Sequence, residues 1–230
     1  MIQYADDTVI YFASSDVDII EKTLNFEMKA ISEYCFVNEL LLNLKKGKTE
    51  CTLFGTAKRL RIHGKELKVF YNSFPISFVK EYIYLGNVID NNLNLNSNFE
   101  RSYKRASNRL RQLNNVRKYL TVKAATDIFH FMILPILTYT GTTKLTLTKT
   151  QTQRLQSFMN RAKRITKNDN LNDVYTTIQR QNCMLVRKCL EKKTNSEIYN
   201  GYFEVIKHSK NTRNDKYLLR LPSVKLETAK

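Results

Sequence analysis

Two neighbouring carboxylates, Asp6 and Asp7, are the side chains of this chain that point most directly to chemistry. They stand between the short apolar segment 2–4 and the β-branched and aromatic run 8–12, a pattern typical of a hairpin with an acidic turn. Adjacent carboxylates repel each other, and a divalent metal ion removes that repulsion. Mg²⁺ binds through a few carboxylates, waters and phosphate oxygens, and two such ions can activate a 3′-hydroxyl and neutralise a leaving pyrophosphate. A solvated acidic β-turn explains the same residues without a metal.

An acidic turn of this kind needs strands and a helix around it. The helical spacing of apolar residues predicts a helix over about 16–37, with Ser15 and Asp18 forming a capping box at its beginning. Beyond this helix, glycines separate short β-branched and aromatic segments that are typical of strands, namely 51–54, 60–62, 69–71 and 82–85. The first part of the chain is therefore expected to form a sheet layer with a packed helix.

The positive charge of the chain is confined to its second part. In total, 38 Lys and Arg outnumber 21 Asp and Glu, which leaves a net charge of +17. Residues 1–100 carry a net charge of −2, whereas residues 101–230 carry +19, and this contrast indicates two modules. The boundary is expected in the Asn-rich stretch 90–98, which places the domains at 1–96 and 97–230. Such an excess indicates a nucleic-acid or anionic-membrane partner.

The second module is expected to be helical, with basic faces. Along 101–113, at 100° per residue, the apolar residues fall within about 80° of each other and the cations fill the opposite side. Helices over about 151–167 and 183–193 repeat this pattern, and Thr121 is the expected N-cap of a helix that stops or kinks at Pro135. Ordinary solvated helix faces explain each helix singly, whereas their repetition favours a phosphate-binding surface. The residues expected to contact nucleic acid are Arg101, Lys104, Arg105, Arg109, Arg111, Arg161 and Arg164.

The cysteines and histidines indicate neither a zinc site nor disulfides. The four cysteines form no CxxC pair, and the three histidines are scattered. No apolar run approaches the roughly 18 residues that a membrane span needs, and no secretory signal precedes the first motif. We therefore expect an intracellular protein, nuclear or cytoplasmic. A membrane-surface role is less favoured, because the basic helices lack the aromatic and Leu-rich faces that such helices use.

Several motifs, in order and in similar spacing, resemble the reverse transcriptases of non-LTR (LINE-type) retrotransposons. They are Tyr4-Ala5-Asp6-Asp7-Thr8, the helix after it, Leu42-Asn43 through Lys48-Thr49-Glu50 to Phe54-Gly55, and Tyr84-Leu85-Gly86 through Asp90 and Leu93. The basic helix near Arg101 and the segment 133–139 resemble the region that follows the palm domain in that family. The resemblance implies an α+β fold: a partial reverse-transcriptase palm, which is an antiparallel sheet with a packed helix, followed by an all-helical thumb-like module.

By this resemblance, the chain is part of an RNA-directed DNA polymerase with RNA template, DNA primer and deoxynucleoside triphosphates as partners. Asp6 and Asp7 would ligate Mg²⁺, and Tyr4 would lie under the primer terminus. Lys48 would be a catalytic cation near the incoming triphosphate, although a surface-loop lysine is an equally good interpretation. The primer grip would be Tyr84, Leu85 and Gly86, a segment that a simple strand end also explains.

The sequence departs from that family upstream of the acidic turn. In such polymerases a further metal-ligating aspartate and the fingers precede this turn, whereas three residues precede Tyr4 here. We therefore expect this chain alone not to polymerise DNA. Two hypotheses remain: a reverse-transcriptase part that is catalytic when joined to upstream sequence, or a non-catalytic RNA- or DNA-binding module that uses the basic helices.

Overall fold

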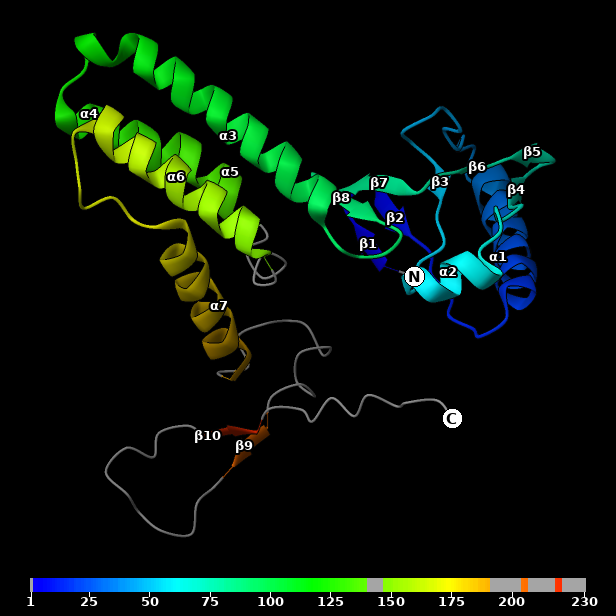
Figure 1. The fold of residues 1–230 in the computed structure, drawn as a ribbon. Coiled ribbons are helices and arrows are strands. Elements are labelled where there is room, and N and C mark those ends of the chain that lie inside the picture. Colours follow the sequence, from blue (N-terminus) through cyan, green and yellow to red (C-terminus); the bar gives the residue numbers. More distant parts are fainter. Residues whose placement is uncertain (1, 140–146, 191–203, 207–217, 221–230) are drawn as a thin grey trace. The chain divides into compact units, whose positions relative to one another are not determined.

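The computed structural model describes residues 2–139, 147–190, 204–206 and 218–220 (Figure 1). The chain forms two compact units, residues 1–104 and 105–230. The helix α3 (Asn96–Val116) runs through the division between them. The boundary expected from the sequence, between residues 96 and 97, falls at the beginning of this helix. Within the described ranges, no helix combines the length and apolar character that crossing a bilayer requires.

The first unit contains the long helix that the apolar spacing predicts. The helix α1 spans Val17–Val37, and its inward face buries Ile20, Met28 and Cys35. Its cap differs from the expected one, because the Asp16 side chain, and not Ser15, accepts the backbone N–H of Asp18 at 2.8 Å. Aspartate is as good an N-cap as serine, so both residues fit the sequence pattern equally well.

Four small two-stranded ladders accompany α1, so the α+β class is confirmed. The pairs are β1 (Ile2–Tyr4) with β2 (Asp7–Val9), β3 (Glu50–Cys51) with β6 (Ser77–Phe78), β4 (Phe70–Tyr71) with β5 (Phe74–Pro75), and β7 (Glu81–Tyr84) with β8 (Asn87–Asp90). The expectation of one antiparallel sheet is wrong, because the ladders are separate and the β3–β6 pair is parallel. The strand expected at 60–62 is also wrong: Thr56 caps the short helix α2 (Ala57–His63) by accepting the Arg59 N–H.

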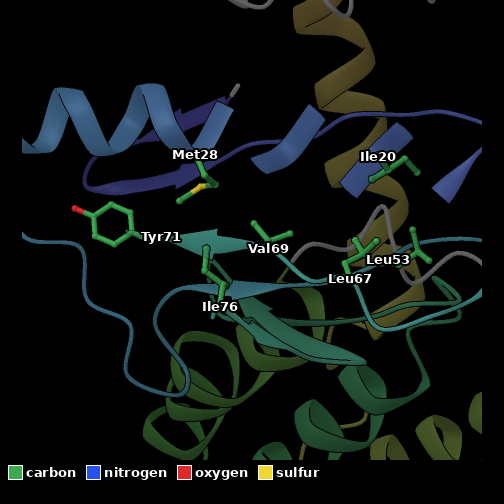
Figure 2. Close-up of a cluster of buried hydrophobic side chains, with 7 residues drawn as sticks. All are labelled: Ile20, Met28, Leu53, Leu67, Val69, Tyr71 and Ile76. Atoms are coloured by element: carbon green, nitrogen blue, oxygen red, sulfur yellow. The ribbon is translucent and has the colours of Figure 1, made fainter. Parts of the chain in front are cut away.

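Apolar side chains between α1 and the strand segments form the core of the first unit (Figure 2). Ile20 and Met28 project from α1 toward Leu67, Val69, Tyr71 and Ile76, with Leu53 at one end of the cluster. Two polar side chains of α1 complete this contact. The Asn25 side chain donates to the Lys68 carbonyl at 2.8 Å and accepts the Phe70 N–H at 3.0 Å, while Glu21 accepts the Lys68 N–H. These bonds join α1 to the backbone at the beginning of β4 and satisfy its polar groups.

The second unit is mainly helical, as expected. It continues α3 and adds η1 (Arg117–Tyr119), α4 (Val122–Ile128), the π-helical turn η2 (Phe129–Ile133), α5 (Leu134–Thr138), α6 (Lys149–Thr166) and α7 (Val174–Leu190). Its most deeply buried large side chains include Phe129, Ile133, Phe158, Met159 and Ile178. The all-helical expectation is wrong in one place, because β9 (Glu204–Ile206) pairs with β10 (Leu218–Arg220).

Thr121 begins α4 as the sequence predicts, by accepting the Ala124 N–H at 3.1 Å. Pro135 lies in the first turn of α5, where a missing N–H costs no helical hydrogen bond. The π-helical turn η2 therefore joins α4 to α5 just before the proline. The helix α6 begins with a full capping box between Thr148 and Gln151.

Arg117 joins η1 to the end of α6 through its guanidinium group. Its Nε donates to the Ile165 carbonyl at 2.6 Å, and its two terminal nitrogens donate to the carbonyls of Leu120 and Thr166. Because these bonds satisfy the last carbonyls of a helix, we expect Arg117→Ala to lower the free energy of unfolding by about 2 kcal/mol. Urea denaturation measures the loss. The exposed Lys123→Ala in the same unit is the control, and an equal effect there would contradict the capping role.

Candidate functional site

The hairpin that the sequence predicts is present, but its loop has only two residues, because Asp7 is already part of β2. Tyr4 of β1 pairs with Asp7 of β2, so Ala5 and Asp6 form the loop between them. Ala5 has a φ of 54°, the left-handed conformation that such tight hairpins require and that alanine adopts at a cost. Asp6 and Asp7 are both exposed to solvent. The hairpin therefore presents two adjacent carboxylates at its tip.

Asp6 and Asp7 are the residues that the sequence predicts as ligands of a magnesium ion. Mg²⁺ is commonly held by one or two carboxylates, its remaining positions being filled by water and substrate phosphate. Among the residues that the structure describes, no third Asp, Glu, His or Cys joins the pair closely enough to form a three-ligand group. The magnesium site expected at Asp6 and Asp7 stays a prediction.

Two tyrosines of β7 stack on each other, and the charge of Asp7 affects one of them. Tyr82 and Tyr84 share one face of the strand, with ring centroids 6.0 Å apart and an interplanar angle of 26°. Burial raises the pKa of the Tyr82 phenol to about 12, and the neighbouring Tyr84, Asp7 and Glu50 add to the shift. The charges of Asp7 and Glu50, which come from two other segments of the first unit, thus act on the Tyr82 phenol.

The sequence motifs alone did not single out Tyr82 or Glu50. The signal for Tyr82 was present, since the alternation Tyr82-Ile83-Tyr84 puts both rings on one face of a strand. The effect of Asp7 on Tyr82 could not be predicted from the sequence, because it depends on how two separate hairpins pack.

The titration of Tyr82 provides a test of this packing. Because the pKa of the phenol rises from its ordinary 10.0 to about 12, folding disfavours the ionised form. The contribution of the protonated Tyr82 phenol to the free energy of unfolding is fully present below pH 10. It is lost as the pH rises from 10 toward 12. We expect the absorbance difference between wild type and Tyr82→Phe to titrate with a pKa of about 12, above the ordinary value of 10.0. In Asp7→Asn this transition should move to lower pH, and an unchanged midpoint would contradict the proximity of the two groups.

Lys48 lies in a turn just before β3. Its N–H donates to the Lys45 carbonyl at 3.0 Å, and the Gly47 N–H donates to Glu50 Oε1 at 2.7 Å. The Lys48 side chain is exposed, and no ion pair joins it to Asp6 or Asp7 within the described part of the chain. Its catalytic role stays a prediction.

The segment Tyr84-Leu85-Gly86 forms the tight turn between β7 and β8. Tyr84 pairs with Asn87, and the two loop residues have φ values of 45° for Leu85 and 81° for Gly86. Two successive positive φ values are the property of a type I′ hairpin turn, which explains the glycine. A role in binding a primer strand is not tested by this geometry.

Substitution of Gly86 tests that turn. Because an L-residue in the left-handed region is strained, we expect Gly86→Ala to lower the free energy of unfolding by about 1 kcal/mol. Gly86→Asn should cost less, since asparagine tolerates this conformation better than alanine. Thermal denaturation of both variants measures the difference, and a larger loss for asparagine than for alanine would contradict the assigned turn.

The hairpin β7–β8 is anchored to the beginning of α3 by buried polar side chains. Asp90 is 5% exposed and accepts the N–H groups of Leu95 at 2.8 Å and Asn94 at 3.3 Å. Asn98 accepts the Val88 N–H at 3.2 Å, and Ser97 hydrogen-bonds to Glu81 of β7. The segment around Asp90 therefore has a structural role in this chain, because it fixes the beginning of α3.

The basic face of α3 is exposed along its length. Ala106, Leu110 and Leu113 are buried, as the periodicity predicts. The cations opposite them are all exposed, namely Arg101, Lys104, Arg105, Arg109 and Arg111. Between residues 101 and 168 the sequence has 15 Lys and Arg but a single acid, Asp127. In the described part of α3, no ion pair with a carboxylate neutralises these five cations.

The helix α6 shares these properties. It contains no Asp or Glu, and Arg161 and Arg164 are exposed. The Arg161 guanidinium lies 5.7 Å from the centroid of the Phe158 ring, which orients it without using its charge in an ion pair. The structure thus shows exposed cations on α3 and α6 but tests no nucleic-acid contact. In comparisons with known proteins, no family model, no curated protein and no solved structure matches this chain.

Proposed function

We propose that the chain binds nucleic acid through the exposed cations of α3 and α6. The observation that supports this most directly is the charge of α3, where five cations lie exposed on the side opposite the buried residues and Glu100 is the single acid of the helix. Unpaired cations repel each other, and a polyanion relieves that repulsion while releasing its own counterions. A solvated helix face usually mixes charges of both signs, so this face is better explained by a phosphate backbone.

We further propose that the β1–β2 hairpin belongs to the palm of a non-LTR-type reverse transcriptase. Asp6 and Asp7 would hold Mg²⁺, which when bound neutralises charge on phosphate oxygens. Lys48 would add a cation near a triphosphate, and the turn 84–86 would support the primer strand. The support is the resemblance of the motifs together with a hairpin whose tip presents both carboxylates.

Because two carboxylates lack a third nearby ligand among the described residues, we expect no DNA synthesis by this chain alone. Primer extension with purified protein, an RNA template and Mg²⁺ tests this. Incorporation that disappears in Asp6→Ala would overturn the expectation.

The alternative is a non-catalytic RNA- or DNA-binding module that uses the exposed cations of the basic helices. Mn²⁺ binding followed by electron paramagnetic resonance, with and without a deoxynucleoside triphosphate, separates the two. A palm-derived site predicts tighter Mn²⁺ binding with the nucleotide and its loss in Asp6→Ala. Glu27→Gln, which removes an exposed carboxylate on α1, is the matched control. Identical Mn²⁺ binding by the wild type, Asp6→Ala and Glu27→Gln would favour the non-catalytic module.

Nucleic-acid binding itself is tested by fluorescence anisotropy with labelled single strands and duplexes. We expect binding whose affinity falls steeply as salt rises from about 50 to 200 mM. No binding of any of these probes at the lowest salt would overturn the proposal.

A further inference from the structure

The exposed face of α3 carries side-chain amides as well as cations. At 100° per residue, a central row of side chains lies within an arc of about 80°, opposite the buried residues. The row consists of Arg101, Arg105, Asn108, Gln112 and Asn115, all of them exposed. At 1.5 Å per residue it extends over about 21 Å of the helix.

Cations flank this central row on both sides. Lys104 and Arg111 lie along one edge, and Arg109 lies along the other, where its guanidinium donates to Gln112 Oε1 at 3.1 Å. Amides can donate to phosphate oxygens, but asparagine, glutamine and arginine are also the side chains that pair with base edges in the major groove. Amides combined with arginines in the centre, with cations at the edges, match a surface that contacts base edges centrally and phosphates laterally.

The dimensions of an α-helix indicate which form of nucleic-acid duplex α3 can enter. With its side chains, an α-helix is about 10–12 Å across and fits the major groove of B-form DNA, which is about 12 Å wide. The major groove of an A-form RNA duplex is too narrow and deep for side chains to read. In the major groove of B-form DNA, arginine pairs with guanine, and asparagine or glutamine pairs with adenine.

We propose that α3 lies in the major groove of B-form duplex DNA, with Arg105, Asn108 and Gln112 facing base edges and the flanking cations on the phosphates. This inference rests on the proposed nucleic-acid binding and specifies its ligand. It assigns sequence preference to a face whose charge alone would bind any polyanion.

The test compares duplexes of about 20 base pairs in three forms, DNA, RNA and the RNA–DNA hybrid, by anisotropy at equal salt. DNA duplexes with a randomised centre are first selected for binding to the full chain. The enriched sequence is then prepared in all three forms. We expect enrichment of guanine and adenine, and at least about tenfold tighter binding of the DNA duplex. Asn108→Ala combined with Gln112→Ala should remove this preference and leave the salt dependence unchanged.

The exposed Asn114→Ala lies outside the row and is the matched control; it should keep the preference. Binding of RNA or hybrid duplexes as tight as that of DNA would overturn the inference while the proposed function stands. A preference for DNA that survives in the double variant would overturn it as well. Absence of binding to any probe would overturn the proposed function itself. Because the replaced amides are exposed, RNA-duplex binding and thermal melting of the double variant should match wild type, which verifies its folding.

Discussion

Replacement of Arg101, Lys104, Arg105 and Arg111 by glutamine is expected to weaken nucleic-acid binding by about 10² to 10³-fold near physiological salt. Each phosphate contact releases close to one counterion from a duplex, so the slope of log K against log salt should become shallower by about 3 to 4. All four side chains are exposed and lie opposite the buried residues of α3, so the substitutions leave the core intact. Anisotropy titrations at several salt concentrations measure both quantities.

The control removes the same amount of charge from the first unit. Lys45, Lys46, Lys58 and Arg61 are also exposed, and their replacement by glutamine changes the net charge equally. We expect that variant to bind with nearly the wild-type salt slope. An equal loss in both variants would mean that net charge, and not the face of α3, determines binding.

A second large effect is expected from the core of the second unit. Phe129 is 0% exposed in the π-helical turn η2, and its ring meets His130 edge-on with centroids 5.6 Å apart. Removal of a fully buried phenylalanine side chain costs about 3–5 kcal/mol, through lost burial and the cavity that remains. We therefore expect Phe129→Ala to unfold much of the second unit at moderate temperature.

Phe131 provides a matched comparison in the same turn. It is 78% exposed, so Phe131→Ala should change the free energy of unfolding by less than about 0.5 kcal/mol. Urea denaturation followed by circular dichroism measures both variants. Similar losses for the two phenylalanines would contradict the assigned burial of η2.

The long helices were predictable because their apolar residues repeat at helical spacing. Ile20, Met28 and Cys35 of α1 and Ala106, Leu110 and Leu113 of α3 are buried as that spacing requires. Where local signals competed, the prediction failed. The segment 60–62 has strand-like residues, yet the Thr56 cap starts a helix there, and Asp16 displaces Ser15 as the cap of α1.

Within the candidate site, the hairpin turn and its two carboxylates followed from the local sequence, since strand pairing over a two-residue loop is a short-range property. The residues that surround the two carboxylates did not follow from the local sequence. The pKa of Tyr82 depends on Asp7, which is 75 residues away in sequence, and on Glu50 of a third segment. Arg117, which caps α6 from 48 residues away, carried no sign of that role in its own neighbourhood.

The sequence by itself determined the alternation of buried and basic faces along α3 and α6, the acidic turn and the concentration of charge beyond residue 100, because each depends on spacing within one element. Only the tertiary structure decided which small ladders form, how Asp90 and Asn98 anchor the hairpin β7–β8 to α3, and which side chains lie near Asp7. Those contacts join residues that are distant in sequence, and their formation depends on the packing of a shared core.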